Sequence, residues 1–207
     1  MSTGLLGKKI GMTSVFSSVG EMIPVTVLEV GPCVVTQVKT DENDGYTAVQ
    51  LGFDEISGEK LNKPLAGHVK KASEKGFRVL REFRTAGDDE LELGSEVNVS
   101  MFQVGEKINI SGISKGRGFQ GTIKRHGFAR GPETHGSRNH RKPGSIGNSA
   151  WPGKVVKGKR LPGHMGVDRK TIKNLTIVDI KADQNIILVK GAIPGPKTGV
   201  VEIRKVG

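Results

Sequence analysis

A single segment, residues 115–170, constrains the fold of this chain more than any other feature of the sequence. It holds 14 lysine and arginine residues but only two acids, a net charge of +12, whereas the remaining 151 residues together carry −1. It also holds 12 glycines, and no apolar run in it is longer than two residues. Such a stretch cannot bury enough apolar surface to offset the entropy cost of ordering its backbone. We therefore predict a basic, non-globular extension whose order comes from a partner.

The alternative interpretation of this segment is a disordered tail that only interacts with solvent. Strand-like sequence resumes beyond it, so the segment is instead an internal excursion that leaves near Ser114 and returns near Thr171. A concentrated positive charge is typical of a protein that binds nucleic acid. Glycines let the backbone approach phosphates closely, and arginine and lysine side chains neutralise them.

The flanks of the extension are rich in short β-like runs of Val, Ile and Thr that are separated by turn residues. The candidate strands are residues 22–30, 33–39, 46–53, 96–100, 107–111, 174–180, 185–190 and 199–204. Many short strands with regular turns favour a mainly β barrel or sandwich. We assign residues 1–55, 96–114 and 171–207 to a barrel. Residues 56–95 are polar, with a candidate helix at 65–75, and are predicted to form a small α+β insertion.

Several classes of protein are disfavoured. The longest strictly apolar run is four residues, Ile186 to Val189, whereas a membrane span needs about 20. No apolar stretch follows Lys8 and Lys9, so no secretory signal is expected. The one cysteine, Cys33, cannot form an internal disulfide or a thiolate metal cage, which fits a reducing compartment. We expect no membrane partner.

Gly116, Gly118 and Gly121 have the spacing of a dinucleotide-binding loop. That fingerprint also needs a following helix, a second parallel strand and an acid about 20 residues further on. Here basic residues follow at 124–126, and the nearest acid is Glu133. We interpret the motif as a sharp bend that exposes backbone amides to phosphate.

Other catalytic or metal-binding patterns are weak. Four histidines (126, 135, 140 and 164) lie in the extension without a nearby cysteine or carboxylate pair, and the surrounding positive charge would repel a metal ion. Ser145 lacks the glycine spacing of a hydrolase nucleophile. We therefore expect no catalytic residue, no metal and no cofactor.

Trp151, the one tryptophan, lies in this polar extension. It is either a small local packing anchor or a residue that stacks on a base at the far point of the extension. The run Lys157-Gly158-Lys159-Arg160 belongs to the predicted phosphate-facing surface.

Residues 102–125 resemble the signature of the family of the third protein of the large ribosomal subunit, in its bacterial or organellar form. The matching residues are Phe102, Asn109, Gly112, Ser114, Gly116, Arg117, Gly118, Gly121 and Arg125. Further matches occur in order along the chain at residues 7–13, 23–27, 44–46, 62–64, 81–84, 143–147 and 188–191. The resemblance therefore covers essentially the whole sequence.

The resemblance implies a six-stranded barrel like those of translation factors, with a small inserted subdomain. It implies a structural ribosomal protein, not an enzyme, whose extension threads large-subunit rRNA toward the peptidyl-transferase centre. It also implies a role in early subunit assembly, with large-subunit proteins fourteen and nineteen as neighbours. The expected location is the ribosome in the cytoplasm, and an organellar ribosome is also compatible. Some relatives carry a modified Gln near the tip of the extension, but residues 148–153 contain none, so that methylation is not expected here.

We predict that the rRNA-binding residues are the basic side chains of the extension together with one histidine and the tryptophan. They are Lys115, Arg117, Lys124, Arg125, Arg130, Arg138, His140, Arg141, Lys142, Trp151, Lys154, Lys157, Lys159, Arg160 and Arg169. Two other functions compete with this interpretation. One is a free RNA-binding translation or assembly factor, and the other is a nucleotide-dependent enzyme that rests only on the glycine motif.

Overall fold

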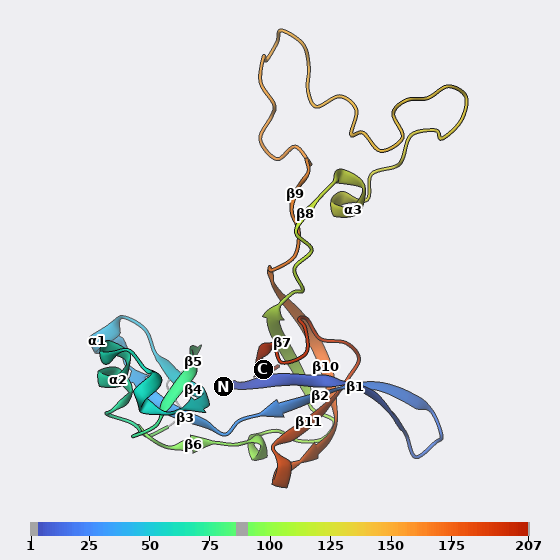
Figure 1. Cartoon of the computed structure of the whole chain (residues 1–207). Helices are drawn as coiled ribbons and strands as arrows, with labels where there is room; N and C mark the ends of the chain where they lie inside the picture. Colours follow the sequence, from blue (N-terminus) through green and yellow to red (C-terminus); the bar gives the residue numbers. More distant parts are fainter. Residues whose placement is uncertain (1–3, 86–90, 207) are drawn as a thin grey trace. The chain divides into compact units, whose positions relative to one another are not determined.

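The computed structural model describes residues 4–85 and 91–206 of the chain. These residues form two compact units, a first unit of residues 4–85, 91–113 and 169–206 and a second unit of Ser114–Asp168. Strands outnumber helices, which confirms the prediction of a mainly β chain (Figure 1). None of the helices among the described residues is long and apolar enough to cross a membrane.

Six strands of the first unit form a closed ring of hydrogen-bonded neighbours in the order β1-β12-β7-β10-β11-β2. Their bounds are β1 Leu5–Phe16, β2 Met22–Val30, β7 Lys107–Ile113, β10 Arg169–Lys181, β11 Ile186–Lys190 and β12 Val200–Lys205. All six pairs are antiparallel. The ring joins both ends of the chain, because β12 pairs with β1 and with β7.

Alternation along the ring strands explains how they bury their apolar side chains. Ile108 and Ile110 of β7 are fully buried, as are Ile187 of β11 and Ile203 of β12. Side chains two positions apart lie on the same face of a strand, so Ile108 and Ile110 of β7 face the shared core together. Burying one such side chain is worth about 1.5–3 kcal/mol.

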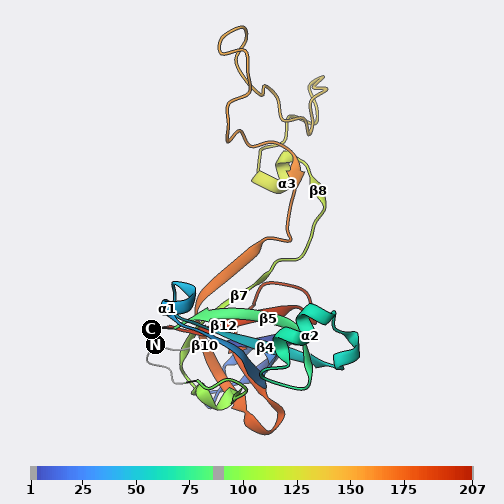
Figure 2. The same cartoon turned by 90° about the vertical axis from the view of Figure 1, so that its left-hand side faces the viewer.

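A second sheet in the same unit has the order β5-β4-β3-β6. The strands are β3 Cys33–Lys39, β4 Ala48–Ile56, β5 Gly76–Arg84 and β6 Glu96–Val97, and the short helical elements of this region are α1 Asp41–Asp44, η1 Gly58–Lys60, α2 Lys63–Val69 and η2 Val99–Met101. Both faces of β3 are covered. Val35 belongs to the core that includes the ring residues, whereas Val34 packs with Val69 of α2 and Phe77 of β5. Figure 2 shows α2 beside β5.

This second sheet corrects one assignment made from the sequence. The sequence pattern assigns residues 33–55 to the barrel, but β3 and β4 lie in the sheet of β5 and β6 and pair with no ring strand. The chain changes sheet directly after β2, where Gly31 adopts a φ of +71°. Alternation reveals where a strand lies but not which strand is its partner, so no periodic pattern marks this exchange. The helix expected at 65–75 lies at 63–69, and residues 99–101 form η2 instead of continuing the strand.

The second unit contains only three short elements, β8 Phe119–Gln120, α3 Thr122–His126 and β9 Gly163–His164. Every buried apolar residue in the described part of the chain lies in the first unit, and the one buried residue of Ser114–Asp168 is the polar Thr122. This lack of an apolar core is what the composition of the basic segment predicts.

Candidate nucleic-acid interface

The second unit begins as an antiparallel pair of chain segments. The Ser114 amide donates to the Asp168 carbonyl at 2.9 Å, and the Arg117 amide donates to the Met165 carbonyl at 2.9 Å. The Met165 amide in turn donates to the Gly118 carbonyl at 3.0 Å. The ladder continues where β8 pairs with β9. Backbone hydrogen bonds therefore hold the outgoing and returning segments side by side.

This ladder changes the interpretation of the glycine motif. The Arg117 amide is bonded to the returning segment, so it is not available to a phosphate as the sequence suggested. A helix does follow the motif, but α3 is only five residues long and β8 is paired antiparallel. A dinucleotide fold needs a parallel β-α-β unit, which is not present here among the described residues.

Helix α3 is fastened to the returning segment by its own side chains. The Arg125 guanidinium donates to the Leu161 carbonyl at 2.8 Å, and Nε2 of His126 lies 3.1 Å from the same oxygen. A Cβ atom at Gly163 would lie 2.6 Å from Nη1 of Arg125, so glycine leaves room for this side chain. Arg125 is half-buried, and its hydrogen bond to Leu161 gives it a structural role in the unit.

A closed loop forms within the second unit, where hydrogen bonds bring residues 131 and 140 together. The Gly131 amide donates to the His140 carbonyl at 3.0 Å, and Nδ1 of His140 lies 3.0 Å from the Pro132 carbonyl. Arg130 forms an ion pair with Glu133 at 2.9 Å. A Cβ atom on Gly131 would overlap the Asn139 carbonyl, so this closure requires glycine. The His140 ring therefore contacts its own backbone.

All of the predicted rRNA-binding side chains except Arg125 are exposed. With the described acids, only Arg130 and Arg169 among them form ion pairs, and Arg169 does so with Glu202 of β12 in the first unit. Trp151 is 87% exposed, so little of its side chain packs against the described residues. The surface of the second unit is thus positively charged and largely free of internal neutralisation.

The sequence missed a cluster of arginines in the first unit. Glu202 lies 3.6 Å from Arg81 of β5 and 3.8 Å from Arg204 of β12, and it also pairs with Arg169 of β10. Three guanidinium groups around one carboxylate leave an excess of positive charge at this place. Arg81 and Arg169 are far from Glu202 along the chain, so no local sequence signal could have found the cluster.

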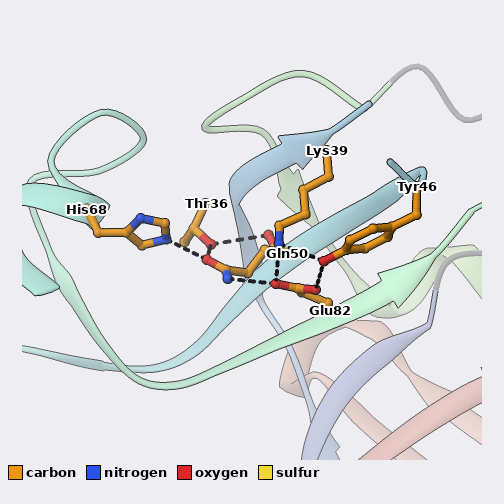
Figure 3. Close-up of polar contacts among 6 residues, drawn as sticks. All are labelled: Thr36, Lys39, Tyr46, Gln50, His68 and Glu82. Atoms are coloured by element: carbon orange, nitrogen blue, oxygen red, sulfur yellow. Dashed lines mark hydrogen bonds and ion pairs between the residues drawn. The ribbon is translucent and has the colours of Figure 1, made fainter. Parts of the chain in front are cut away.

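A polar network links three strands of the second sheet to α2 (Figure 3). Lys39 donates to the Tyr46 hydroxyl at 2.7 Å and pairs with Glu82 at 3.0 Å, and the Tyr46 hydroxyl donates to Glu82 at 2.9 Å. Hydrogen bonds from Lys39 and Tyr46 lower the pKa of Glu82, and hydrogen bonds with Tyr46 and Glu82 raise the pKa of Lys39. The remaining members of the network are Thr36, Gln50 and His68.

This network has the character of a structural connection. Its one carboxylate is neutralised by a lysine, and the Gln50 side-chain oxygen accepts from Thr36 at 2.9 Å and lies 2.7 Å from Nε2 of His68. The contacts fasten α2 to the sheet, and they present no activated nucleophile or paired carboxylates for acid–base chemistry.

Metal binding and thiol chemistry find no support among the described residues. No three His, Cys, Asp or Glu side chains of this part of the chain come together in a way that would hold a metal ion. Cys33 is buried, and burial raises the pKa of its thiol to about 12. A thiol with such a pKa stays protonated at neutral pH and is a poor nucleophile.

Comparison with known proteins relates the chain as a whole to a protein family. The sequence profile of the family described as Ribosomal protein L3 matches residues 68–185. The large ribosomal subunit protein uL3 of Desulforapulum autotrophicum is 63% identical over 205 residues, which cover 99% of each chain. The protein of the same name from Desulfatibacillum aliphaticivorans is 57% identical, over 99% of this chain and 97% of the relative. That of Carboxydothermus hydrogenoformans is 51% identical, over 99% and 98%.

Proposed function

Because the chain belongs to the ribosomal protein L3 family, we propose that it is a structural constituent of the large ribosomal subunit and binds rRNA through Ser114–Asp168. The family is a structural component of the ribosome and not an enzyme. The relatives named above are bacterial, and the chain is of the bacterial type. Its place is the ribosome, which is cytoplasmic in bacteria.

The observation that carries the rRNA-binding proposal is the exposed, unneutralised charge of a unit without an apolar core. Exposed lysine and arginine side chains that lack intramolecular partners bind phosphates without first breaking an ion pair. Binding releases counterions from the RNA, which supplies much of the free energy of association. A unit with no core of its own also gains order from a folded RNA around it.

The finer features of this role follow from the resemblance and are part of the proposal. The ring of six strands corresponds to the barrel expected for the family, and Ser114–Asp168 corresponds to its rRNA-threading extension. On this basis the extension reaches toward the peptidyl-transferase centre, and the protein joins the subunit early in assembly. Large-subunit proteins fourteen and nineteen are the proposed neighbours.

Salt dependence of rRNA binding tests the role of the extension. If about half of the 14 basic residues at 115–170 each neutralise a phosphate, the log–log slope of affinity against salt is about −5 to −6. Replacing Lys157, Lys159 and Arg160 by glutamine is expected to flatten the slope by about two to three. The measurement is a filter-binding titration of the whole chain on a large-subunit rRNA fragment.

The matched control is a second triple variant outside the extension. Lys60, Lys70 and Lys71 are exposed lysines of the first unit, and their replacement by glutamine removes the same charge. We expect this variant to keep the slope of the unchanged chain. Equal slopes for both triple variants would contradict a binding role for the extension. Loss of the chain from large subunits in a high-salt wash would instead indicate a free RNA-binding factor.

A further inference from the structure

The β1–β2 hairpin, residues 10–24, extends beyond the ring within the first unit (Figure 1). Strand β1 pairs with β12 only over residues 5–8, and β2 pairs with β11 only over residues 25–29. Beyond these limits β1 and β2 pair with each other as far as Phe16 and Met22. The hairpin therefore lies outside the ring's core, and its side chains are not buried against a second layer.

One face of this hairpin is apolar and exposed. Met12 and Phe16 lie on the same face of β1, because they are an even number of residues apart, and Met22 stands directly opposite Phe16. Their side chains are 51%, 73% and 65% exposed. Single exposed apolar residues are ordinary, but three on one face of a projecting hairpin are typical of a protein-binding site.

The outer edge of β1 is also free over this length. The last hydrogen bonds on that edge join the Lys9 backbone to Gly199 and Thr198. From residue 11 to residue 16, β2 is the only strand among the described residues that pairs with β1. This edge carries neither a charged residue nor a proline, which are the usual devices that prevent an added strand from pairing. It is a template for one further strand.

Charge decides between a protein and an RNA as the occupant of this surface. Residues 10–24 contain a single charged side chain, the acid Glu21. A basic group lies near the base of the hairpin, where a Cβ atom on Gly11 would lie 3.9 Å from Cε of Lys197. A surface that binds RNA needs several basic groups to neutralise phosphates. Exposed methionine and phenylalanine are instead enriched at protein interfaces.

We propose that the β1–β2 hairpin binds an extended strand of a neighbouring protein of the large subunit. The added strand pairs with the free edge of β1 and places apolar side chains against Met12, Phe16 and Met22. A lysine or arginine of the partner lies opposite Glu21. This inference rests on the proposed place of the chain in the large subunit.

Photocrosslinking in assembled subunits tests the inference. The photoreactive residue benzoylphenylalanine replaces Phe16 in the full-length protein. Large subunits are purified from cells that express this variant, and the purified subunits are then irradiated. We expect a crosslink to one protein of the large subunit, identified by mass spectrometry. The double variant Met12→Ser, Met22→Ser is expected to reduce the crosslinked fraction at least about fivefold, because it removes apolar contacts worth about 1 kcal/mol or more at the interface. Because both side chains are exposed, thermal unfolding of the free protein should stay unchanged.

A matched control places the same photoreactive residue at Val104, which is 61% exposed and lies outside the hairpin. A crosslink from this position to the same protein with the same yield would overturn the inference. A crosslink from position 16 to rRNA, or no crosslink from subunits that contain the chain, would also overturn it while leaving the proposed function intact. Absence of the unsubstituted chain from large subunits would overturn the proposed function, and this inference with it.

Discussion

Trp151 has a large apolar side chain that is exposed, with little packing against the described residues. It is 87% exposed, so its truncation removes almost no packing from the free protein. We predict that Trp151→Ala leaves the thermal unfolding of the free protein unchanged but impairs subunit assembly or peptidyl-transferase activity. The measurements are a melting curve of the free protein, and sedimentation and activity of subunits that carry the variant.

The control for this prediction is Trp151→Phe, which keeps an aromatic face for stacking on a base. It should restore most of the assembly or activity that alanine loses. A lower melting temperature for Trp151→Ala, combined with normal subunits, would show that the residue serves packing and not RNA binding.

Glu82 gives the fold a dependence on pH. Hydrogen bonds from Lys39 and Tyr46 lower its pKa below the ordinary value of 4.5. A carboxyl group whose pKa is lower in the folded state contributes stability above its ordinary value and loses that stability as pH falls through the folded value. We therefore predict that Glu82→Gln lowers the free energy of unfolding at pH 7, and that the difference from the unchanged protein disappears in acid, well below pH 4.5.

Urea unfolding at a series of pH values measures this difference. Glu59→Gln is the control, because Glu59 is exposed and forms no ion pair with the described residues. It should change stability little at any pH. A deficit for Glu82→Gln that is the same at pH 7 and at pH 3 would mean that the charge of Glu82 contributes nothing to stability.

At the scale of elements, the packing of β4 against β5 depends on a glycine. A Cβ atom at Gly52 would lie 2.6 Å from the ring of Phe77, which packs with Val34 and Val69 beneath α2. Adding a methyl group to a filled site forces the neighbours to shift, at a cost of about 1–3 kcal/mol. We predict that Gly52→Ala lowers the free energy of unfolding by this amount, as measured by urea titration.

Gly67 of α2 offers the matched control. A Cβ atom there meets nothing within 4 Å, and the residue lies inside a helix. Alanine favours the helix more than glycine does, so Gly67→Ala should raise the free energy of unfolding by about 0.5–1 kcal/mol. Equal effects of the two substitutions would show that the Phe77 ring moves aside freely.

At the scale of the whole molecule, the two units differ in what stabilises them. The buried apolar residues of the described chain all lie in the first unit, whereas Ser114–Asp168 depends on local backbone hydrogen bonds. Segments with few buried apolar contacts open with little cost in free energy. We predict that brief proteolysis of the free protein cuts within 115–170 while the two flanking fragments stay associated.

The association of the fragments follows from the ring. Strands β1, β2 and β7 precede Ser114–Asp168 and β10, β11 and β12 follow it, and the two sets pair with each other at several places. Gel filtration after proteolysis, followed by denaturing electrophoresis, measures this association. Cleavage of the flanks as rapid as that of the extension, or separation of the two fragments, would contradict the prediction.

Local patterns of residues were enough to predict the basic segment, most of the strands and the family. The segregation of charge predicted where the basic segment lies, because charged residues and glycines can be counted directly along the sequence. Alternation of Val and Ile located most of the strands, because every second residue of a strand faces the core. The motif residues at 102–125 and elsewhere pointed to the family that the profile and the relatives confirm.

Which distant segments of the chain lie together became clear only from the folded protein. The fold placed β3 and β4 in the second sheet, brought Arg81 and Arg169 to Glu202, and turned Arg125 toward the Leu161 carbonyl. It also left the edge of β1 without a further strand beyond Lys9 among the described residues. The physical reason is that these contacts join residues far apart along the chain. Which distant segments pair depends on how the whole core packs, and such long-range pairing leaves no periodic signal in the sequence.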